Sequence, residues 1–145
     1  MDRIFQRMIA NRTWGGTVLI CLFTGPVFPS HCARMSRRPS PDTGAAFDTT
    51  FPEVFAEATK QNPAIHDGAV MVGRHGALEG YKILGWSFRL FPDAEVNDGP
   101  ANRGSAFNSA YAMSRVPTVD AVYWISGNAI YRFCGGTTFE VSPAR

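Results

Sequence analysis

The residues best suited to chemistry form a short run, His66-Asp67-Gly68-Ala69, directly ahead of an apolar segment. A carboxylate such as that of Asp67 is able to bind a divalent metal ion or to accept a proton from a ribose hydroxyl, and a glycine lets a ligand approach the backbone. Asp-Gly is also among the commonest turn dipeptides, so a plain turn explains the pair equally well. Asp67, Gly68 and Ala69 are therefore candidates for a ligand site.

A second candidate opens a predicted helix at Gly104-Ser105. Small residues leave the first amides of such a helix accessible, and its dipole favours a phosphate group. Asn108 follows one turn later. Ser105 as an ordinary helix cap is the alternative. The segment lacks both the Gly-Lys-Ser/Thr ending of a P-loop and a dinucleotide-binding fingerprint.

A third candidate is the run that holds Trp86, Phe88, Arg89 and Leu90 on one predicted strand. Aromatic rings beside a cation suit a base and its phosphate. Core packing explains Trp86 and Phe88 equally well, and Arg89 then reaches solvent. Outside these runs the chain has no nucleophile elbow, and its three cysteines have neither zinc-type spacing nor the number for a disulfide framework.

The elements that must position these residues alternate between helix and strand. Helices are predicted over residues 51–60 and 105–115, and strands over 68–72, 81–91, 119–126, 129–134 and 138–141. A polar loop is predicted over 93–102, and Gly127-Asn128 is typical of a tight hairpin turn. This order predicts an α/β fold: a single layered domain with a mixed β-sheet flanked by helices.

The composition and the charge distribution exclude some classes of function for this chain. The 145 residues suit one domain, and 45% apolar against 18% charged residues suit a folded one. Residues 1–38 hold six arginines against one acid, whereas the rest holds eight basic against eleven acidic groups. A weakly acidic body is a poor partner for DNA or RNA, but it is compatible with a small nucleotide.

The amino-terminal segment is predicted to be a basic, partly apolar tail and linker over residues 1–47, which leaves the folded domain to residues 48–145. On this prediction the protein is cytoplasmic, and Met35 is an alternative start to Met1. Basic residues ahead of a short apolar run also resemble a secretory signal. The alternative is therefore a secreted or membrane-anchored protein, held through residues 13–29.

Together these segments resemble the diadenylate cyclase (DAC) domain. The run Asn62-Pro63-Ala64-Ile65-His66-Asp67-Gly68-Ala69 looks like the family's His-Asp-Gly-Ala strand, and Gly85-Trp86-Ser87-Phe88-Arg89-Leu90 is weakly similar to the segment that ends in Leu-Pro-Leu. The helix from Gly104-Ser105 and the strand over 119–126 resemble the family's phosphate-binding helix and the strand after it. The resemblance covers roughly residues 48–141.

The resemblance implies a bacterial protein of cyclic dinucleotide signalling. Active members join two ATP molecules into cyclic di-AMP with Mg or Mn, across a face-to-face dimer. The aspartate that corresponds to Asp67 serves the metal and the ribose 3′-hydroxyl, so Asp67 is the catalytic and metal-binding residue if this chain is a cyclase. A homodimer and a separate effector protein are the partners that the resemblance implies besides a nucleotide.

One departure decides the predicted function. Where the family has Arg-His-Arg, this chain has Ala106-Phe107-Asn108, so the cations that hold the triphosphate are missing. We therefore expect a sensor-type domain that binds a linear or cyclic adenine nucleotide without cyclising it. The sequence assigns no definite cofactor to such a domain, and Mg or Mn is expected only for a cyclase. An active cyclase and a structural or dimerisation domain are the alternatives. The expected nucleotide-binding residues are Asp67, Gly68, Ala69, Trp86, Phe88, Arg89, Leu90, Gly104, Ser105 and Asn108.

Overall fold

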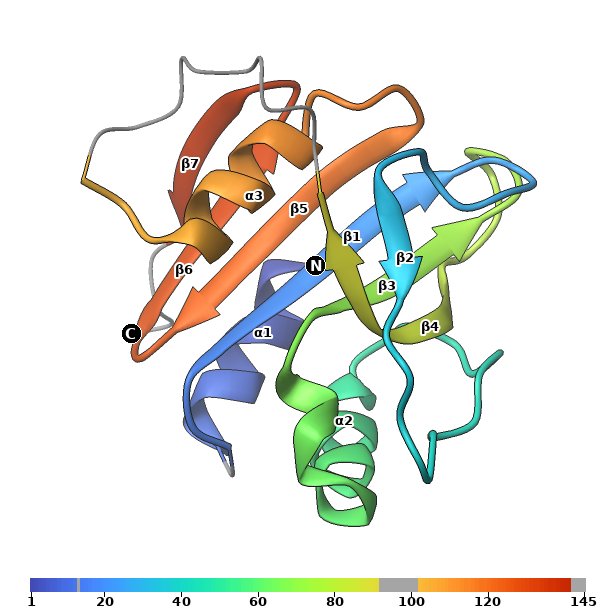
Figure 1. The fold of residues 1–145 in the computed structure, drawn as a ribbon, viewed down its shortest axis with the longest axis vertical. Helices are drawn as coiled ribbons and strands as arrows, with labels where there is room; N and C mark the ends of the chain where they lie inside the picture. Colours follow the sequence, from blue (N-terminus) through green and yellow to red (C-terminus); the bar gives the residue numbers. More distant parts are fainter. Residues whose placement is uncertain (13, 92–101, 142–145) are drawn as a thin grey trace.

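A computed structural model describes residues 1–12, 14–91 and 102–141, and in it the strands form one mixed sheet with helices on both faces (Figure 1). The described strands follow the order β2-β4-β3-β1-β5-β6-β7. Only β1 and β3 run parallel, and the other neighbours are antiparallel. The single α/β domain with a mixed sheet is thus confirmed. The strands are β1 (Thr17–Thr24), β2 (Cys32–Arg34), β3 (Ala69–Arg74), β4 (Lys82–Leu90), β5 (Val119–Ser126), β6 (Ala129–Cys134) and β7 (Thr137–Val141).

The amino-terminal segment belongs to the domain, so the predicted boundary at residue 48 is wrong. The apolar run that resembled a signal is β1, which lies between β3 and β5 in the middle of the sheet. Residues 18–23 are all buried, because a strand covered on both faces needs apolar groups on both. No helix in the described part of the chain has the length and apolarity to cross a membrane.

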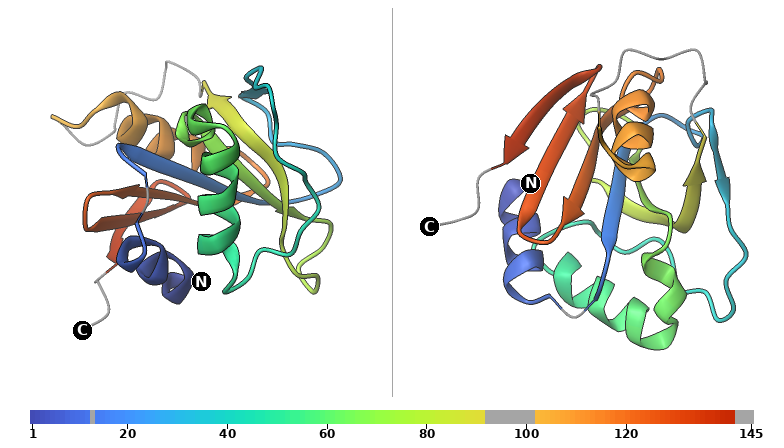
Figure 2. Two further views of the ribbon diagram at one scale, coloured as in Figure 1. Left: turned by 90° about the horizontal axis from the view of Figure 1, so that it is seen from below. Right: turned by 60° about the vertical axis from the view of Figure 1, so that its left-hand side comes forward.

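Helices cover the two faces of the sheet unequally. Helix α1 (Asp2–Ala10) and helix α2 (Phe51–Gln61) contact each other below one face, and helix α3 (Ser105–Met113) lies on the other (Figure 2). The α2 prediction is confirmed: Pro52 occupies the first turn, and Phe51, Phe55 and Ala58 are buried. Each face therefore has its own apolar core, called below the α2-side core and the α3-side core.

The other predicted elements hold with small shifts at their ends. Strands β3 to β7 and helix α3 all occur where the hydrophobic pattern placed them. The predicted loop over 93–102 lies outside the described residues except for Asn102, which has a positive φ of 62°. The elements that the pattern did not predict are α1, β1, β2 and a single 3₁₀ turn, η1 (Pro63–His66).

One register row crosses the whole sheet on the α3 side. Ala69 of β3 pairs with Leu19 of β1 on one side and with Phe88 of β4 on the other, and Phe88 pairs in turn with Arg34 of β2. Leu19, Ala69 and Phe88 all belong to the α3-side core. Since paired residues share a face of a sheet, this row places Arg34 on the same side as Ala69.

Candidate functional site

The Asp-Gly-Ala run forms the junction between η1 and β3. Asn62 caps η1, because its side-chain oxygen accepts a hydrogen bond from the Ala64 amide at 3.1 Å. Asp67 follows the turn with 71% of its side chain exposed. Gly68 has a φ of +87°, and a Cβ there would lie 2.6 Å from Met35 Cε and 2.9 Å from the Phe88 carbonyl oxygen. Only glycine fits this corner, and it leaves the Asp67 carboxylate at the surface.

A cavity of about 230 Å³ lies at this corner. Asp67 and Gly68 line one side of it, and Ala106, in the first turn of α3, also lines it. The start of β1 and His66 complete the lining, which consists of Gly16, Thr17, Leu19, His66, Asp67, Gly68 and Ala106. The fold thus brings together the two segments that carried the strongest resemblance, although they are far apart in sequence.

The other predicted residues at the start of α3 do not line this cavity. Gly104 is the extended residue ahead of the helix, and Ser105 is exposed without a side-chain capping bond. Asn108 is exposed, and its side-chain amide donates to the Arg103 carbonyl at 3.3 Å. Neither Gly104 nor the side chains of Ser105 and Asn108 have a described contact with Asp67.

Phe107, in the first turn of α3, is a core residue. Its side chain is 2% exposed and meets the rings of Trp124, Tyr131 and Phe133 edge-on, with centroids 4.9 to 5.4 Å away. Arg103 lies over the rings of Phe107 and Tyr131, at 4.8 and 5.6 Å from their centroids. The position that the resemblance aligned with the histidine of Arg-His-Arg is thus part of the α3-side core here.

The predicted aromatic cluster on β4 is divided between the two faces of the sheet. Phe88 and Leu90 pack into the α3-side core. Trp86 belongs to the α2-side core, where its ring lies 6.4 Å from that of Phe55 and its indole N–H donates to the Asp42 carbonyl at 2.9 Å. Trp86 and Phe88 therefore do not flank one base as predicted. Arg89 is exposed and directly follows Phe88 on the strand. Because successive side chains of a strand alternate between its faces, Arg89 points away from the α3 side and is not the predicted phosphate partner either.

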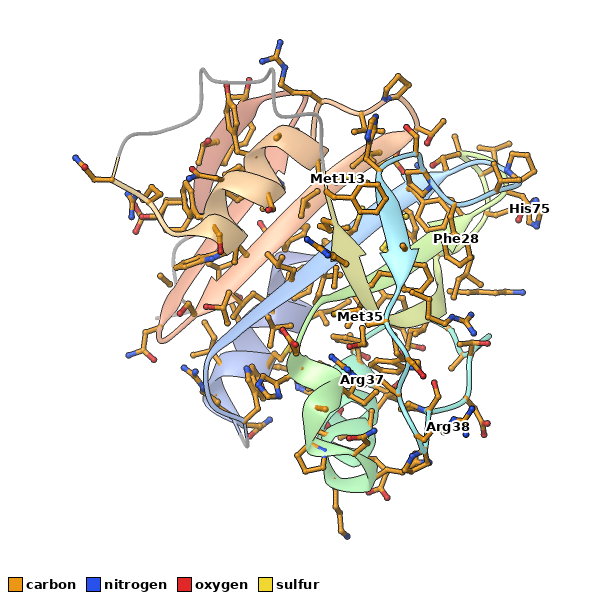
Figure 3. All side chains as sticks on the ribbon, in the orientation of Figure 1. Phe28, Met35, Arg37, Arg38, His75 and Met113 are labelled. Carbon is orange, nitrogen blue, oxygen red and sulfur yellow. The ribbon has the colours of Figure 1, made fainter. Side chains whose placement is uncertain are left out.

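Three residues beside Asp67, namely Met35, Arg37 and Ser87, were not among the predicted site residues. The Ser87 hydroxyl donates to the Asp67 carbonyl and accepts a hydrogen bond from Arg37 Nε at 2.9 Å. Arg37 also donates from Nη2 to Asp67 Oδ2 at 3.2 Å. Met35 covers Gly68, and its amide donates to the Ser87 carbonyl at 3.0 Å. Figure 3 shows Met35, Arg37 and Arg38 in succession on the segment that leaves β2.

These contacts do not fit the divalent metal ion that the family resemblance implies at Asp67. A guanidinium group lies where a metal ion would meet Oδ2. Within residues 1–12, 14–91 and 102–141, no three His, Cys, Asp or Glu side chains gather into a group that would hold a metal. Carboxylate oxygens are the usual ligands of Mg and Mn, and Asp67 offers a single, already paired carboxylate.

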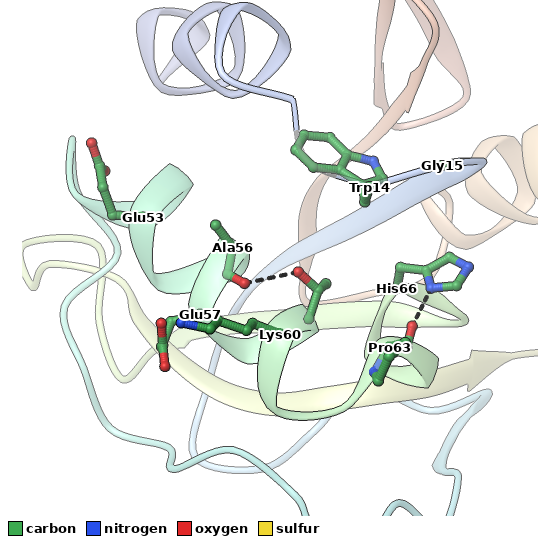
Figure 4. A pocket seen from close by; sticks show the side chains of 9 residues that line it. Trp14, Gly15, Glu53, Ala56, Glu57, Lys60, Pro63 and His66 are labelled. Atoms are coloured by element: carbon green, nitrogen blue, oxygen red, sulfur yellow. Dashed lines mark hydrogen bonds between the residues drawn. The ribbon is translucent and has the colours of Figure 1, made fainter.

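A larger cavity, of about 680 Å³, lies between helix α2 and the segment at Trp14-Gly15 (Figure 4). Its rim carries Glu57 and Lys60, and His66 lines both this cavity and the smaller one. The His66 ring nitrogen Nδ1 hydrogen-bonds with the Pro63 carbonyl. None of the predicted site residues lines the larger cavity, so the candidate site remains the one at Asp67.

Comparison with known proteins identifies the fold. No family model matches the chain, and no curated protein matches its sequence. A Bacillus cereus protein described as a hypothetical membrane spanning protein superposes with a TM-score of 0.61 at 17% identity, over 97% of this chain and 60% of that one. A double mutant of DacA from Staphylococcus aureus superposes with a TM-score of 0.62 at 16% identity, over 98% of this chain and 84% of DacA. The chain has a DAC-like fold and spans about 60% of the Bacillus protein's length.

Proposed function

We propose that this DAC-like domain binds a linear or cyclic adenine nucleotide at the Asp67 cavity and does not cyclise it. The observation that carries the proposal is that an exposed carboxylate, a glycine corner and the start of a helix line one cavity. Asp67 Oδ2 faces Arg37, and the exposed carboxylate accepts a hydrogen bond from a ribose hydroxyl. Gly68 lets the sugar approach the backbone. A likeness to DacA supports the choice of nucleotide.

The residues at the start of α3 support the proposal that the nucleotide is not cyclised. Joining two triphosphates requires cations placed against the charge that develops on the phosphates. Here Ala106 faces the cavity with a methyl group, and Phe107 is buried among aromatic rings. A domain that holds a nucleotide without reacting it acts as a sensor. Recognition of a homodimer partner or a separate effector protein stays a prediction.

A thermal-shift screen of the full chain against ATP, cyclic di-AMP and other cyclic dinucleotides tests the proposal. A nucleotide at a hundred times its dissociation constant stabilises the fold by about 2.7 kcal/mol. Loss of a hydrogen bond to a charged group weakens binding by about 1.5–3 kcal/mol, so Asp67→Asn is expected to lower the affinity tenfold or more. Glu57→Gln, on the rim of the larger cavity, is the matched control and keeps the wild-type affinity.

Two other outcomes separate the alternatives. Cyclic di-AMP produced from ATP and manganese, and lost in Asp67→Asn, would identify an active cyclase. No shift with any nucleotide would leave a structural or dimerisation domain that shares only the fold.

A further inference from the structure

Two arginines near the candidate site come from a part of the chain that has no part in the resemblance: Arg37 contacts Asp67, and Arg34 lies against Phe88. Arg37 has 19% of its side chain exposed, because Ser87 and Asp67 both hold its guanidinium group. The Ser87 backbone is itself fixed, since its carbonyl accepts from the Met35 amide. Arg37 is thus a pre-oriented cation beside Asp67, which lines the cavity, and each of its three nitrogens donates a hydrogen bond: Nε to Ser87, Nη2 to Asp67 and Nη1 to the Ser36 carbonyl at 3.3 Å.

Arg34 is the second cation. It pairs in register with Phe88, which pairs with Ala69, so Arg34 stands two strands from the Asp-Gly-Ala corner on the α3 side. Its guanidinium carbon lies 5.8 Å from the centroid of the Phe88 ring. This residue is exposed, and its guanidinium group lies against the Phe88 ring on the α3 side of the sheet.

The charge balance at this edge favours an anion. Asp67 contributes one negative charge and contacts Arg37, whereas Arg34 and Arg37 contribute two positive charges. A planar guanidinium group binds phosphate oxygens through two parallel hydrogen bonds. Arg37 Nη2 donates to Asp67 Oδ2 and Nη1 donates to the Ser36 carbonyl, so the second N–H of Nη1 is the one left for a phosphate oxygen.

We propose that Arg37, assisted by Arg34, binds the phosphate of the nucleotide in place of both a metal ion and the missing Arg-His-Arg cations. This inference rests on the proposed function and deepens it, because it makes the site a metal-independent one for a phosphorylated ligand. On this proposal the phosphate cations lie at the end of β2 and on the segment that follows it, and not at the start of α3. Arg37 is a binding residue, and Ser87 positions it.

Calorimetric titration of the full chain in EDTA tests this proposal, with ATP and inorganic tripolyphosphate as separate probes. We expect ATP to bind without metal, and Arg37→Gln to weaken it at least tenfold. Arg34→Gln should weaken it by a smaller factor. Arg38→Gln, which removes the adjacent exposed arginine, should leave binding unchanged. Circular dichroism of each variant checks that it folds.

The outcomes separate this inference from the proposed function. ATP binding that requires manganese, or that is as tight in Arg37→Gln as in the wild type, overturns the role of Arg37 and leaves the nucleotide site standing. Binding of tripolyphosphate alone, dependent on Arg37, supports the arginine site and overturns the nucleotide. Binding of neither probe overturns both.

Discussion

Trp86 and Phe88 are two residues apart on β4, yet their side chains lie on opposite faces of the sheet. Alternate residues of a regular strand share a face, so this arrangement requires an extra residue between them. The pairing shows it: from Ala69↔Phe88 to Met71↔Gly85, β3 advances by two residues and β4 by three. Ser87, with a φ of 59°, is the bulged residue that faces Asp67 and Arg37.

Replacement of Ser87 tests this bulge. Ser87→Ala removes the hydroxyl that donates to the Asp67 carbonyl, and we expect a loss of about 1–3 kcal/mol in the free energy of unfolding. Ser87→Gly also lacks the hydroxyl but adopts the positive φ without strain, so it should be less destabilised. Urea unfolding measures both. Equal stability of Ser87→Ala and the wild type would show that the hydroxyl does not support this corner.

Gly68 gives a second test of the corner geometry. A Cβ in Gly68→Ala would meet the Phe88 carbonyl oxygen at 2.9 Å, and the positive φ adds strain, so we expect a loss of about 1–3 kcal/mol. Gly104→Ala is the matched control, because a Cβ there meets nothing within 4 Å. Thermal unfolding compares the two variants. A smaller effect at Gly68 than at Gly104 would contradict the described corner.

Deletion of residues 1–34 tests the place of β1 in the domain. The deletion removes α1, the central strand β1 and the edge strand β2. Strands β3 and β5, which both pair with β1 in the full chain, then lack that neighbour. We expect residues 35–145 to lack a cooperative unfolding transition, whereas the full chain shows one. A cooperative transition in the shortened chain would restore the tail interpretation.

Tyr123 predicts a dependence of stability on alkaline pH. Burial, with a smaller contribution from Asp2 and against the opposing effect of Arg132, raises the pKa of Tyr123 to about 12. Because the unfolded chain loses this proton near its ordinary pKa of 10, the tyrosine stabilises the fold below pH 10 and loses that contribution as the pH rises to 12. Denaturant midpoints from pH 9 to 12 should fall less steeply in Tyr123→Phe than in the wild type. Parallel curves would contradict the shift.

Much of the fold is predictable from sequence because its elements obey simple periods. Helix α2 and the hairpin of β5 and β6 carry their own turn and cap residues. Strand β1 was missed since its continuous apolar run, preceded by arginines, reads equally as a targeting segment. Only its neighbours in the sheet reveal its role.

The site was also predictable in part, because some of its residues follow local sequence patterns. Asp67 and Gly68 are local turn chemistry, and the resemblance located the start of α3. Trp86 was misplaced because the bulge at Ser87 puts its side chain on the opposite face from Phe88 and Leu90, and no local signal marks that serine. Arg37 was missed because its partners, Ser87 and Asp67, are distant in sequence.

The most direct test of the nucleotide site is an amide chemical-shift titration of the full chain with the nucleotide that gives the largest thermal shift. The proposed function predicts that the largest changes fall on Gly16, Asp67, Gly68 and Ala106, which line the Asp67 cavity. Changes concentrated instead on Trp14, Glu57 and Lys60 would place the ligand in the larger cavity and contradict the assignment. So would the absence of any change at saturating nucleotide.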